Sequence, residues 1–316
     1  MSEFDLIARY FTRPAVPGQA VLGIGDDCAL LQPKPGMQLA ISSDMLVEGR
    51  HFFPAADALA LGHKCLAVNL SDLAAMGAQP LAFTLALALP AAQDAWLEPF
   101  SRGLLALADL HGCELIGGDT TKGPLTISIT IFGEVPAGAA LRRDAAKVGD
   151  DIWVSGTLGD ARLALAGYRN ELTLTAADQQ AAGERMHCPT PRIALGLALR
   201  GIAHAAIDIS DGLSGDLGHI LERSGVGAVL DVDALPAGPV LQRQPQALQR
   251  RFTLAGGDDY ELCFTAPSDR RKAVLRAAAG MQVTRIGSIE SATGLRFCDK
   301  NGAALDIAVS SFDHFS

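Results

Sequence analysis

The sequence has few aromatic residues and no long apolar run. Phe, Tyr and Trp together make up 5% of its 316 residues, so a core must be built from Ala, Leu, Val and Ile. No segment approaches the 18 or more consecutive apolar residues of a membrane span. The start, MSEFDLIARYF, lacks a basic stretch followed by an apolar one and is not typical of a signal peptide. We therefore expect a cytoplasmic protein with no membrane partner.

The chain also lacks an excess of basic residues. Asp and Glu number 35 against 26 Lys and Arg, a net charge of −9. This argues against nucleic acid as a partner, because general nucleic-acid binding needs a basic surface. A small anionic ligand stays compatible with the charge if a cation mediates its binding.

The six cysteines are widely spaced and form no C-x-x-C pair. A structural zinc site or a disulfide framework is therefore not expected. We expect buried, reduced thiols.

Several motifs of nucleotide and metal enzymes are missing. There is no G-x-x-x-x-G-K-[ST] loop, and GIGDDC lacks the third glycine of G-x-G-x-x-G. There is also no H-E-x-x-H, nucleophile elbow or protein-kinase signature set. The segment IDISDGLSGD resembles a calcium loop only superficially, because Ile207 and Ile209 would fall at ligand positions that need oxygen.

The hydrophobic pattern predicts a mixed α/β protein with two domains. The Pro/Gly/Ala-rich stretch 135–149 marks a boundary, which we place to give domains 1–137 and 138–316. Clean alternation in 125–135 puts Ile127, Ile129 and Ile131 on one face of a strand. Further strands are expected at 37–46, 81–89, 151–156, 205–210, 228–232 and 261–266, and helices at 60–78, 96–112 and 212–225.

Acidic residues recur after apolar segments, each beside Gly, Ser or Thr. Any one of them could be a helix cap or a turn residue. Their repetition instead suggests several elements that end at one polar site. The residues are Asp26, Asp27, Asp44, Asp72, Asp119, Asp208, Asp211, Asp258, Asp259 and Glu261.

Such a cluster favours a cation and a phosphate ligand. Carboxylates repel one another unless a cation lies between them, and Asp, Ser and Thr oxygens suit Mg²⁺ better than zinc. The glycines of IGGD and AGGD let backbone N–H groups approach phosphate. Arg142 and Arg143 are either phosphate contacts or a solvated pair. His51 is either structural or an anion contact, and Phe312 is either a packing residue or a stacking platform.

The combination of motifs carries a family resemblance over essentially the whole chain. GIGDDCALL, ISSDMLVEGRHF, KCLAVNLSDLAAMGAQP, LIGGDTTKGPLTISITIFGEV, AIDISDGLSGDLGHI and GGDDYELCF together resemble the bacterial thiamine-monophosphate kinases, of the aminoimidazole-ribonucleotide-synthetase-like superfamily. The resemblance implies a homodimer, with a shared β-barrel-like core of N-terminal domains and an α/β C-terminal domain. It also implies conversion of ATP and thiamine monophosphate to ADP and thiamine diphosphate with several Mg²⁺ ions.

The resemblance further implies roles for individual residues. Metal ligands would be Asp27, Ser42, Ser43, Asp44, Asp72, Asp119, Asp208 and Asp211. ATP contacts would be Gly118, Asp119, Arg143 and Ser210, and substrate contacts His51, Asp258 and Phe312. No general base or covalent nucleophile is expected, and Asp26 is left to bond nearby backbone N–H groups. Two departures concern the substrate contacts: Asp258 stands where the family often has Glu, and Phe312 where Tyr or Trp is frequent.

Other functions remain open on these residues alone. A related enzyme such as aminoimidazole ribonucleotide synthetase would use ATP to activate a carbonyl oxygen. Selenophosphate synthetase is disfavoured because the N-terminal region lacks a reactive Cys in a glycine-rich loop. A non-catalytic sensor would bind ATP and Mg²⁺ without turnover.

Overall fold

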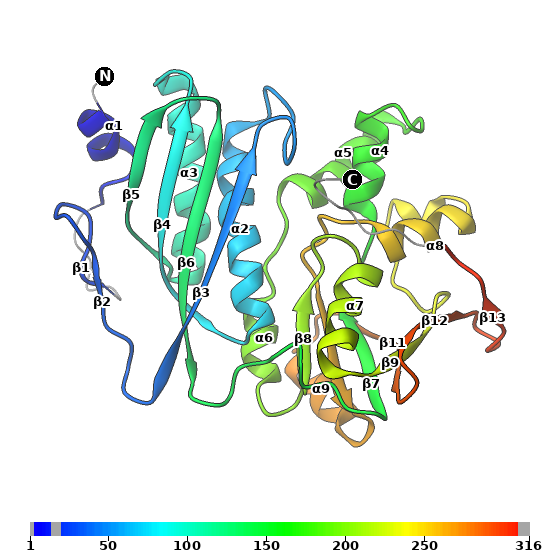
Figure 1. The fold of residues 1–316 in the computed structure, drawn as a ribbon. Coiled ribbons are helices and arrows are strands. Elements are labelled where there is room, and N and C mark those ends of the chain that lie inside the picture. Colours follow the sequence, from blue (N-terminus) through cyan, green and yellow to red (C-terminus); the bar gives the residue numbers. More distant parts are fainter. Residues whose placement is uncertain (1–2, 14–19, 309–316) are drawn as a thin grey trace. The chain divides into compact units, whose positions relative to one another are not determined.

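A computed structural model describes residues 3–13 and 20–308, and the chain in it divides into two compact units (Figure 1). Unit 1 comprises Met1–Leu73 and Ala78–Gly138, and unit 2 comprises Ala74–Gly77 and Ala139–Ser316. Each unit contains its own β-sheet. The mixed α/β class expected from the hydrophobic pattern is confirmed.

Unit 1 is built on a four-stranded sheet with the strand order β3-β6-β4-β5. Only the β4–β5 pair is parallel, and the other pairs are antiparallel. Its strands are β1 Ala20–Leu22, β2 Leu30–Leu31, β3 Met37–Val47, β4 Gln79–Leu89, β5 Glu114–Lys122 and β6 Thr126–Pro136, and its helices are α1 Glu3–Tyr10, α2 Ala58–Ala75 and α3 Asp94–His111.

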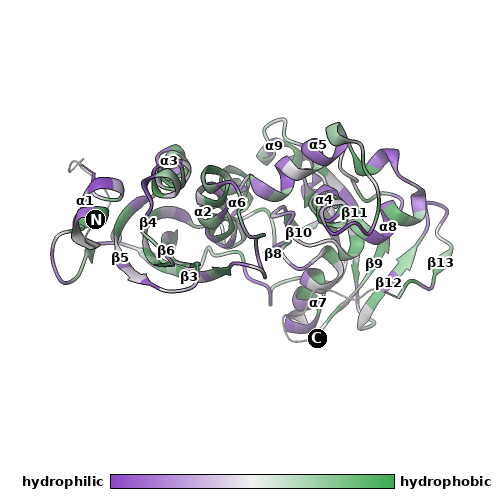
Figure 2. Cartoon of the chain, turned by 90° about the horizontal axis from the view of Figure 1, so that it is seen from above, coloured by the Kyte–Doolittle hydropathy of each residue, from purple (hydrophilic) through white to green (hydrophobic). Residues whose placement is uncertain are grey.

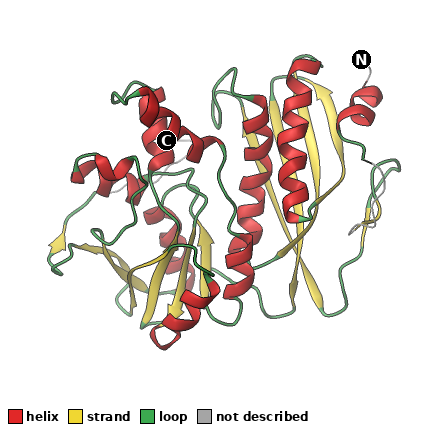
Figure 3. Cartoon of the chain, turned by 180° about the vertical axis from the view of Figure 1, so that it is seen from behind, coloured by secondary structure: helices red, strands yellow, loops and turns green. Residues whose placement is uncertain are grey.

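Helices α2 and α3 cover one face of this sheet, as the views from above and from behind show (Figures 2 and 3). Ile127, Ile129 and Ile131 of β6 are all at most 1% exposed, which confirms the face predicted from their alternation. Helix α3 ends where expected, because Gly112 takes a left-handed conformation with φ 59° and its N–H bonds carbonyls of the last turn.

Unit 2 contains a seven-stranded sheet with the order β13-β12-β9-β11-β7-β10-β8. The β12–β9 pair is parallel and the others are antiparallel. Its strands are β7 Asp150–Ser155, β8 Ala205–Asp208, β9 Gly227–Asp231, β10 Leu262–Pro267, β11 Val283–Glu290, β12 Gly294–Cys298 and β13 Ala304–Leu305. Its helices are α4 Asp160–Tyr168, α5 Ala176–His187, α6 Ile193–Leu199, α7 Leu213–Ser224, α8 Gln246–Ala255 and α9 Arg271–Ala277, with 3-10 turns at Leu241–Arg243 and Ser268–Arg270.

Helix α7 follows β8 after a short loop and carries an apolar stripe. Leu213, Leu217, Ile220 and Leu221 recur at helical spacing and are buried in one core with residues of β7, β8, β9 and β11. This packing fixes the loop between β8 and α7, which holds Ser210 and Asp211.

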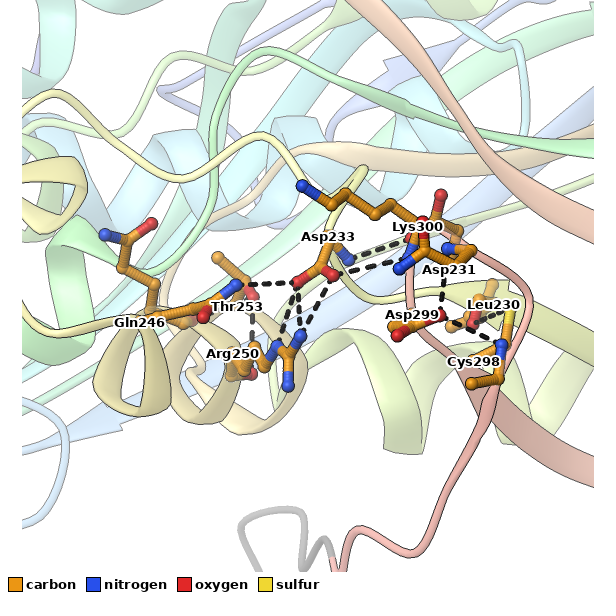
Figure 4. A network of polar contacts seen from close by, with 12 residues as sticks. Leu230, Asp231, Asp233, Gln246, Arg250, Thr253, Cys298, Asp299 and Lys300 are labelled. Atoms are coloured by element: carbon orange, nitrogen blue, oxygen red, sulfur yellow. Dashed lines mark hydrogen bonds and ion pairs between the residues drawn. The ribbon is translucent and has the colours of Figure 1, made fainter.

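Helix α8 is tied to two loops by Asp233, which follows β9 (Figure 4). The Asp233 carboxylate accepts hydrogen bonds from the Arg250 guanidinium at 2.7–2.9 Å and from Gln246 at 3.2 Å. It also accepts the Lys300 N–H at 3.3 Å, so one side chain connects α8 with the ends of β9 and β12.

The cysteines depart in part from expectation. None of the six, all within the described residues, forms a disulfide, and Cys65, Cys113 and Cys263 are buried as predicted, whereas Cys298 is half-buried. Cys28 and Cys188 are exposed, so the prediction of buried thiols is wrong for these two. Both lie outside the regular elements, where no packed layer covers them. In the described ranges, no helix is long and apolar enough to cross a membrane.

Candidate functional site

An acidic group in unit 1 joins strand β3 to helix α2. Ser42 and Asp44 alternate onto the helix-covered face of β3, and the Ser42 hydroxyl donates a 2.5 Å hydrogen bond to Asp72 Oδ2 on α2. Burial, and then the charge of Asp72, raise the pKa of Asp44 to about 6. Three of the predicted metal ligands are therefore brought together by the strand–helix packing.

Asn69 supports this group and was not identified from the sequence. Its side chain is fully buried, its Oδ1 accepts the Asp44 N–H at 3.3 Å, and its Nδ2 donates to Cys65 O at 2.9 Å. Asn69 precedes Asp72 by three residues, so both lie on one side of α2. That spacing in NLSD is the signal that could have found it.

Ser43 lies apart from Ser42, Asp44 and Asp72. Its hydroxyl donates to Ile129 O at 3.1 Å and pairs with the Thr130 hydroxyl at 3.0 Å. Successive strand side chains point to opposite faces, so the Ser43 side chain is on the face without helices. The structure thus separates its side chain from the three ligands above.

The expectation that the acidic residues end their elements is wrong for three of them. Strand β3 continues to Val47 beyond Asp44, Asp119 lies inside β5, and Asp72 lies in the last turns of α2. Strands β3 and β5 pair with their neighbours beyond Asp44 and Asp119, so the hydrogen-bonded ladder continues past these residues.

Gly118 lets edge strand β5, which carries Asp119, lie close to strand β4. Gly118 has φ 147°, and a Cβ there would lie 1.8 Å from Leu85 O on neighbouring β4. Only glycine permits this approach of the two strands. Both Gly118 and Asp119 are exposed, so a ligand can reach them.

Asp26 and Asp27 lie in the connection between β1 and β2, and both are exposed. Asp26 Oδ1 accepts the Asp27 N–H at 2.9 Å, which confirms the structural role expected for Asp26. His51 follows β3, and its Nδ1 accepts the Val47 N–H at 3.0 Å. The other ring nitrogen, Nε2, therefore carries the imidazole proton.

In unit 2 three predicted contacts lie together in sequence: Asp208 is the last residue of β8, and Ser210 and Asp211 lie in the loop between β8 and α7. The N–H groups of Ser210, Asp211 and Gly212 all donate to one oxygen, Asp216 Oδ2, at 3.1, 3.2 and 3.1 Å. Burial, and then the charge of Asp211, raise the pKa of Asp216 to about 7 although these hydrogen bonds lower it. Asp216 was not among the predicted residues.

A second loop in unit 2, Gly256–Tyr260, is hydrogen-bonded to the first. The Asp258 N–H donates to Ser210 O and the Tyr260 N–H to Ile209 O, each at 2.8 Å. Asp258 and Tyr260 have φ 68° and 50°, left-handed conformations that cost free energy in residues other than glycine. The predicted substrate contact Asp258 is therefore held beside the loop that bears Ser210.

Two buried acids anchor the second loop. Asp259 accepts the Gly159 N–H at both carboxylate oxygens, at 2.9 and 3.0 Å. Glu261 is fully buried and accepts the Ser155 hydroxyl at 2.5 Å, Arg185 at 2.7 Å and the Arg192 guanidinium. Burial raises the pKa of Asp259 well above its ordinary value. The paired arginines compensate the charge of Glu261.

The two arginines considered as phosphate contacts, Arg142 and Arg143, differ in their partners. Arg142 forms an ion pair with Asp144, whereas the exposed Arg143 side chain meets no partner among residues 3–13 and 20–308. The main chain of Arg143 is fixed, because its carbonyl accepts the Ser224 hydroxyl at 2.9 Å. Phe312 lies outside the described residues. In that described part, no three His, Cys, Asp or Glu side chains form a group that could hold a metal ion.

Comparisons with known proteins match both units. Residues 25–135 match the family model "AIR synthase related protein, N-terminal domain", and residues 147–300 match "AIR synthase related protein, C-terminal domain". The thiamine-monophosphate kinase of Salmonella typhimurium is 49% identical over 99% of this chain and 98% of that protein.

Solved structures give the same family. The crystal structure of thiamine-monophosphate kinase from Stenotrophomonas maltophilia superposes with a TM-score of 0.85 at 48% identity, covering 96% of each chain. A structure of AaThiL complexed with AMPPCP and TMP has a TM-score of 0.75 at 28% identity and covers 95% of this chain and 94% of that one. With these matches spanning both units, the chain belongs to the thiamine-monophosphate kinases, phosphotransferases among the AIR synthase related proteins.

Proposed function

We propose that this protein transfers the terminal phosphate of ATP to thiamine monophosphate, giving ADP and thiamine diphosphate. The observation that carries the choice of ligands is that a structure similar over 95% of this chain was solved with AMPPCP and TMP bound. The acidic groups of both units agree with a phosphate-transfer reaction that uses a cation.

The residues fit Mg²⁺ by their chemistry. Ser42, Asp44 and Asp72 offer only hard oxygen atoms, and burial together with repulsion by Asp72, which a cation would relieve, raises the pKa of Asp44. Bound magnesium would neutralise phosphate charge and orient the phosphate oxygens. The proposed ligands are Asp27, Ser42, Asp44, Asp72 and Asp119 in unit 1, and Asp208 and Asp211 in unit 2; the Ser43 side chain, on the other face of β3, is not retained among them.

The proposed nucleotide contacts are Gly118, Asp119, Arg143 and Ser210. Exposed Arg143 suits a phosphate, and Gly118 is exposed, so a nucleotide can reach it. His51, through Nε2–H, and Asp258 are the proposed contacts of thiamine monophosphate, together with Phe312.

The transfer needs no general base from the protein. The attacking group is a phosphate oxygen that already carries negative charge, so we propose direct in-line transfer without a phospho-enzyme. The chain's residues then act by positioning the two phosphates and by compensating charge.

We further propose a homodimer formed through the uncovered face of the unit 1 sheet. Leu39, Ile41 and Met45 of β3 lie on the face opposite α2 and α3, and they are 40%, 60% and 56% exposed. A second copy would bury them, as the sequence resemblance implies.

The test is to incubate the protein with ATP, Mg²⁺ and thiamine monophosphate and to separate the products by chromatography. Thiamine diphosphate should form and should vanish with a chelator. A parallel reaction with the formylglycinamidine substrate tests the alternative function, that of an aminoimidazole ribonucleotide synthetase. Formation of no thiamine diphosphate, or formation unaffected by chelator, would refute the proposal.

A further inference from the structure

Asp216 holds the loop that carries Ser210 and Asp211 and that follows Asp208 at the end of β8, although its own side chain is not in the proposed ligand set. It lies in the first turns of α7, and it is only 4% exposed. The N–H groups of Ser210, Asp211 and Gly212 converge on its Oδ2. Consecutive N–H groups at a helix start ordinarily bind an anion such as phosphate. Here the protein's own carboxylate fills that position.

This arrangement leaves a ligand no N–H group of Ser210, Asp211 or Gly212 to bind. The N–H groups of Ser210 and Asp211 are committed to Asp216, so a nucleotide cannot use them. The carbonyl groups of Ile209 and Ser210 are committed to the Tyr260 and Asp258 N–H groups. The loop backbone is thus fixed from two sides.

The adjacent glycine limits where the loop can move. Gly212 has φ 118°, and a Cβ at this position would lie 2.9 Å from the carbonyl carbon of Ala255, at the end of α8. The Ser214 hydroxyl donates to Leu254 O at 2.9 Å, which ties the start of α7 to the same helix end. Because three consecutive N–H groups of the loop bond the Asp216 carboxylate, we expect a shift of that carboxylate to move these loop residues together.

We propose that Asp216 is a positioning residue of the phosphotransferase site. Its carboxylate sets the conformation in which Ser210 and Asp211, next to Asp208 at the end of β8, present their side chains to the magnesium-bound nucleotide. Through the Ser210 carbonyl it also sets the position of Asp258. This inference rests on the proposed function for the identity of the ligand.

Three substitutions test it, with binding of AMPPCP and Mg²⁺ measured by calorimetry. Asp216→Ala removes the shared acceptor and should weaken binding about 10- to 100-fold. Asp216→Asn keeps an oxygen in place for the N–H groups and should recover most of that affinity. Asp216→Glu keeps the charge but shifts the acceptor by one methylene, so it should fold and still bind weakly.

Asp150→Ala is the matched control. Asp150 is likewise buried, at 3% exposure, and accepts the Lys147 N–H and the Thr265 hydroxyl. It lies at the end of the sheet away from Asp208, because it pairs with Pro267 at one end of β10 and Asp208 pairs with Leu262 at the other. It should lower the melting temperature without weakening AMPPCP binding.

Two results would overturn the proposal: wild-type affinity in Asp216→Glu, or an Asp216→Asn variant as weak as Asp216→Ala, which would assign the effect to charge alone. Wild-type protein that binds AMPPCP but leaves thiamine monophosphate unchanged would refute the proposed function and not the role of Asp216.

Discussion

Ser42 and Asp72, 30 residues apart in the chain, are joined by a 2.5 Å hydrogen bond from the serine hydroxyl to Asp72 Oδ2. The bond fixes the Asp72 carboxylate against strand β3, close enough for its charge to add to the effect of burial, which raises the pKa of Asp44. The protein thus keeps two carboxylates together at a cost that a bound cation would offset.

Asp72→Asn should abolish most activity while leaving the fold intact. The amide oxygen can still accept the Ser42 hydroxyl, but one negative charge of the proposed magnesium site is lost. Turnover of thiamine monophosphate should fall at least about 100-fold. The melting temperature should stay level or rise, because the repulsion of Asp44 is relieved.

Exposed Asp269→Asn, the same chemical change outside the site, should keep wild-type turnover. Survival of activity in Asp72→Asn would remove this carboxylate from the proposed metal ligands.

Gly118→Ala should destabilise unit 1. The new Cβ would lie 1.8 Å from Leu85 O, so strands β4 and β5 must separate locally. We expect the free energy of unfolding in urea to fall by about 1–3 kcal/mol. Gly123→Ala is the control, because its Cβ would meet only Ala88 Cβ, at 3.5 Å. Equal stability of the two variants would contradict the close approach at Gly118.

Ile41→Lys should dissociate the proposed homodimer, since it places a charge on the uncovered sheet face. Light scattering after size-exclusion chromatography should give a dimer for the wild type and a monomer for this variant. Leu110→Lys, at a residue 76% exposed on α3, should remain dimeric. A monomeric wild type would contradict the dimer.

Asp233→Ala should loosen α8 from the ends of β9 and β12. Although burial raises it, hydrogen bonds from Arg250 and from the Lys300 N–H lower the pKa of Asp233 overall. The variant should lose about 1.5–3 kcal/mol of unfolding free energy at pH 7 in urea titrations. Asp269→Ala, an exposed change in the same unit, should lose little.

The Asp233 effect should depend on pH with a definite sign. A carboxyl whose folded pKa is depressed stabilises the fold above its unfolded pKa of about 4, and that stability is lost as pH falls through the folded value. The difference between wild type and Asp233→Ala should therefore shrink in acid. A difference that grows below pH 4 would contradict the ion pairing.

Much of the fold could be predicted because its signals are local. The alternation at Ile127, Ile129 and Ile131 specified β6 and its buried face, and Gly112 specified the end of α3. Side-chain direction in a strand follows from backbone geometry alone, so a single segment contains that information. The recurring acidic residues likewise predicted a polar site.

What remained hidden depends on packing between distant segments. Whether Ser42 or Ser43 joins Asp72 is decided by which face of β3 meets α2, and Asn69 and Asp216 act through contacts with backbone groups on other elements or loops. The sequence by itself determined the elements, the family resemblance and the oxygen-rich chemistry. Only the tertiary structure decided which of those oxygens share one site, because hydrogen bonds across the fold depend on distances that no local pattern encodes.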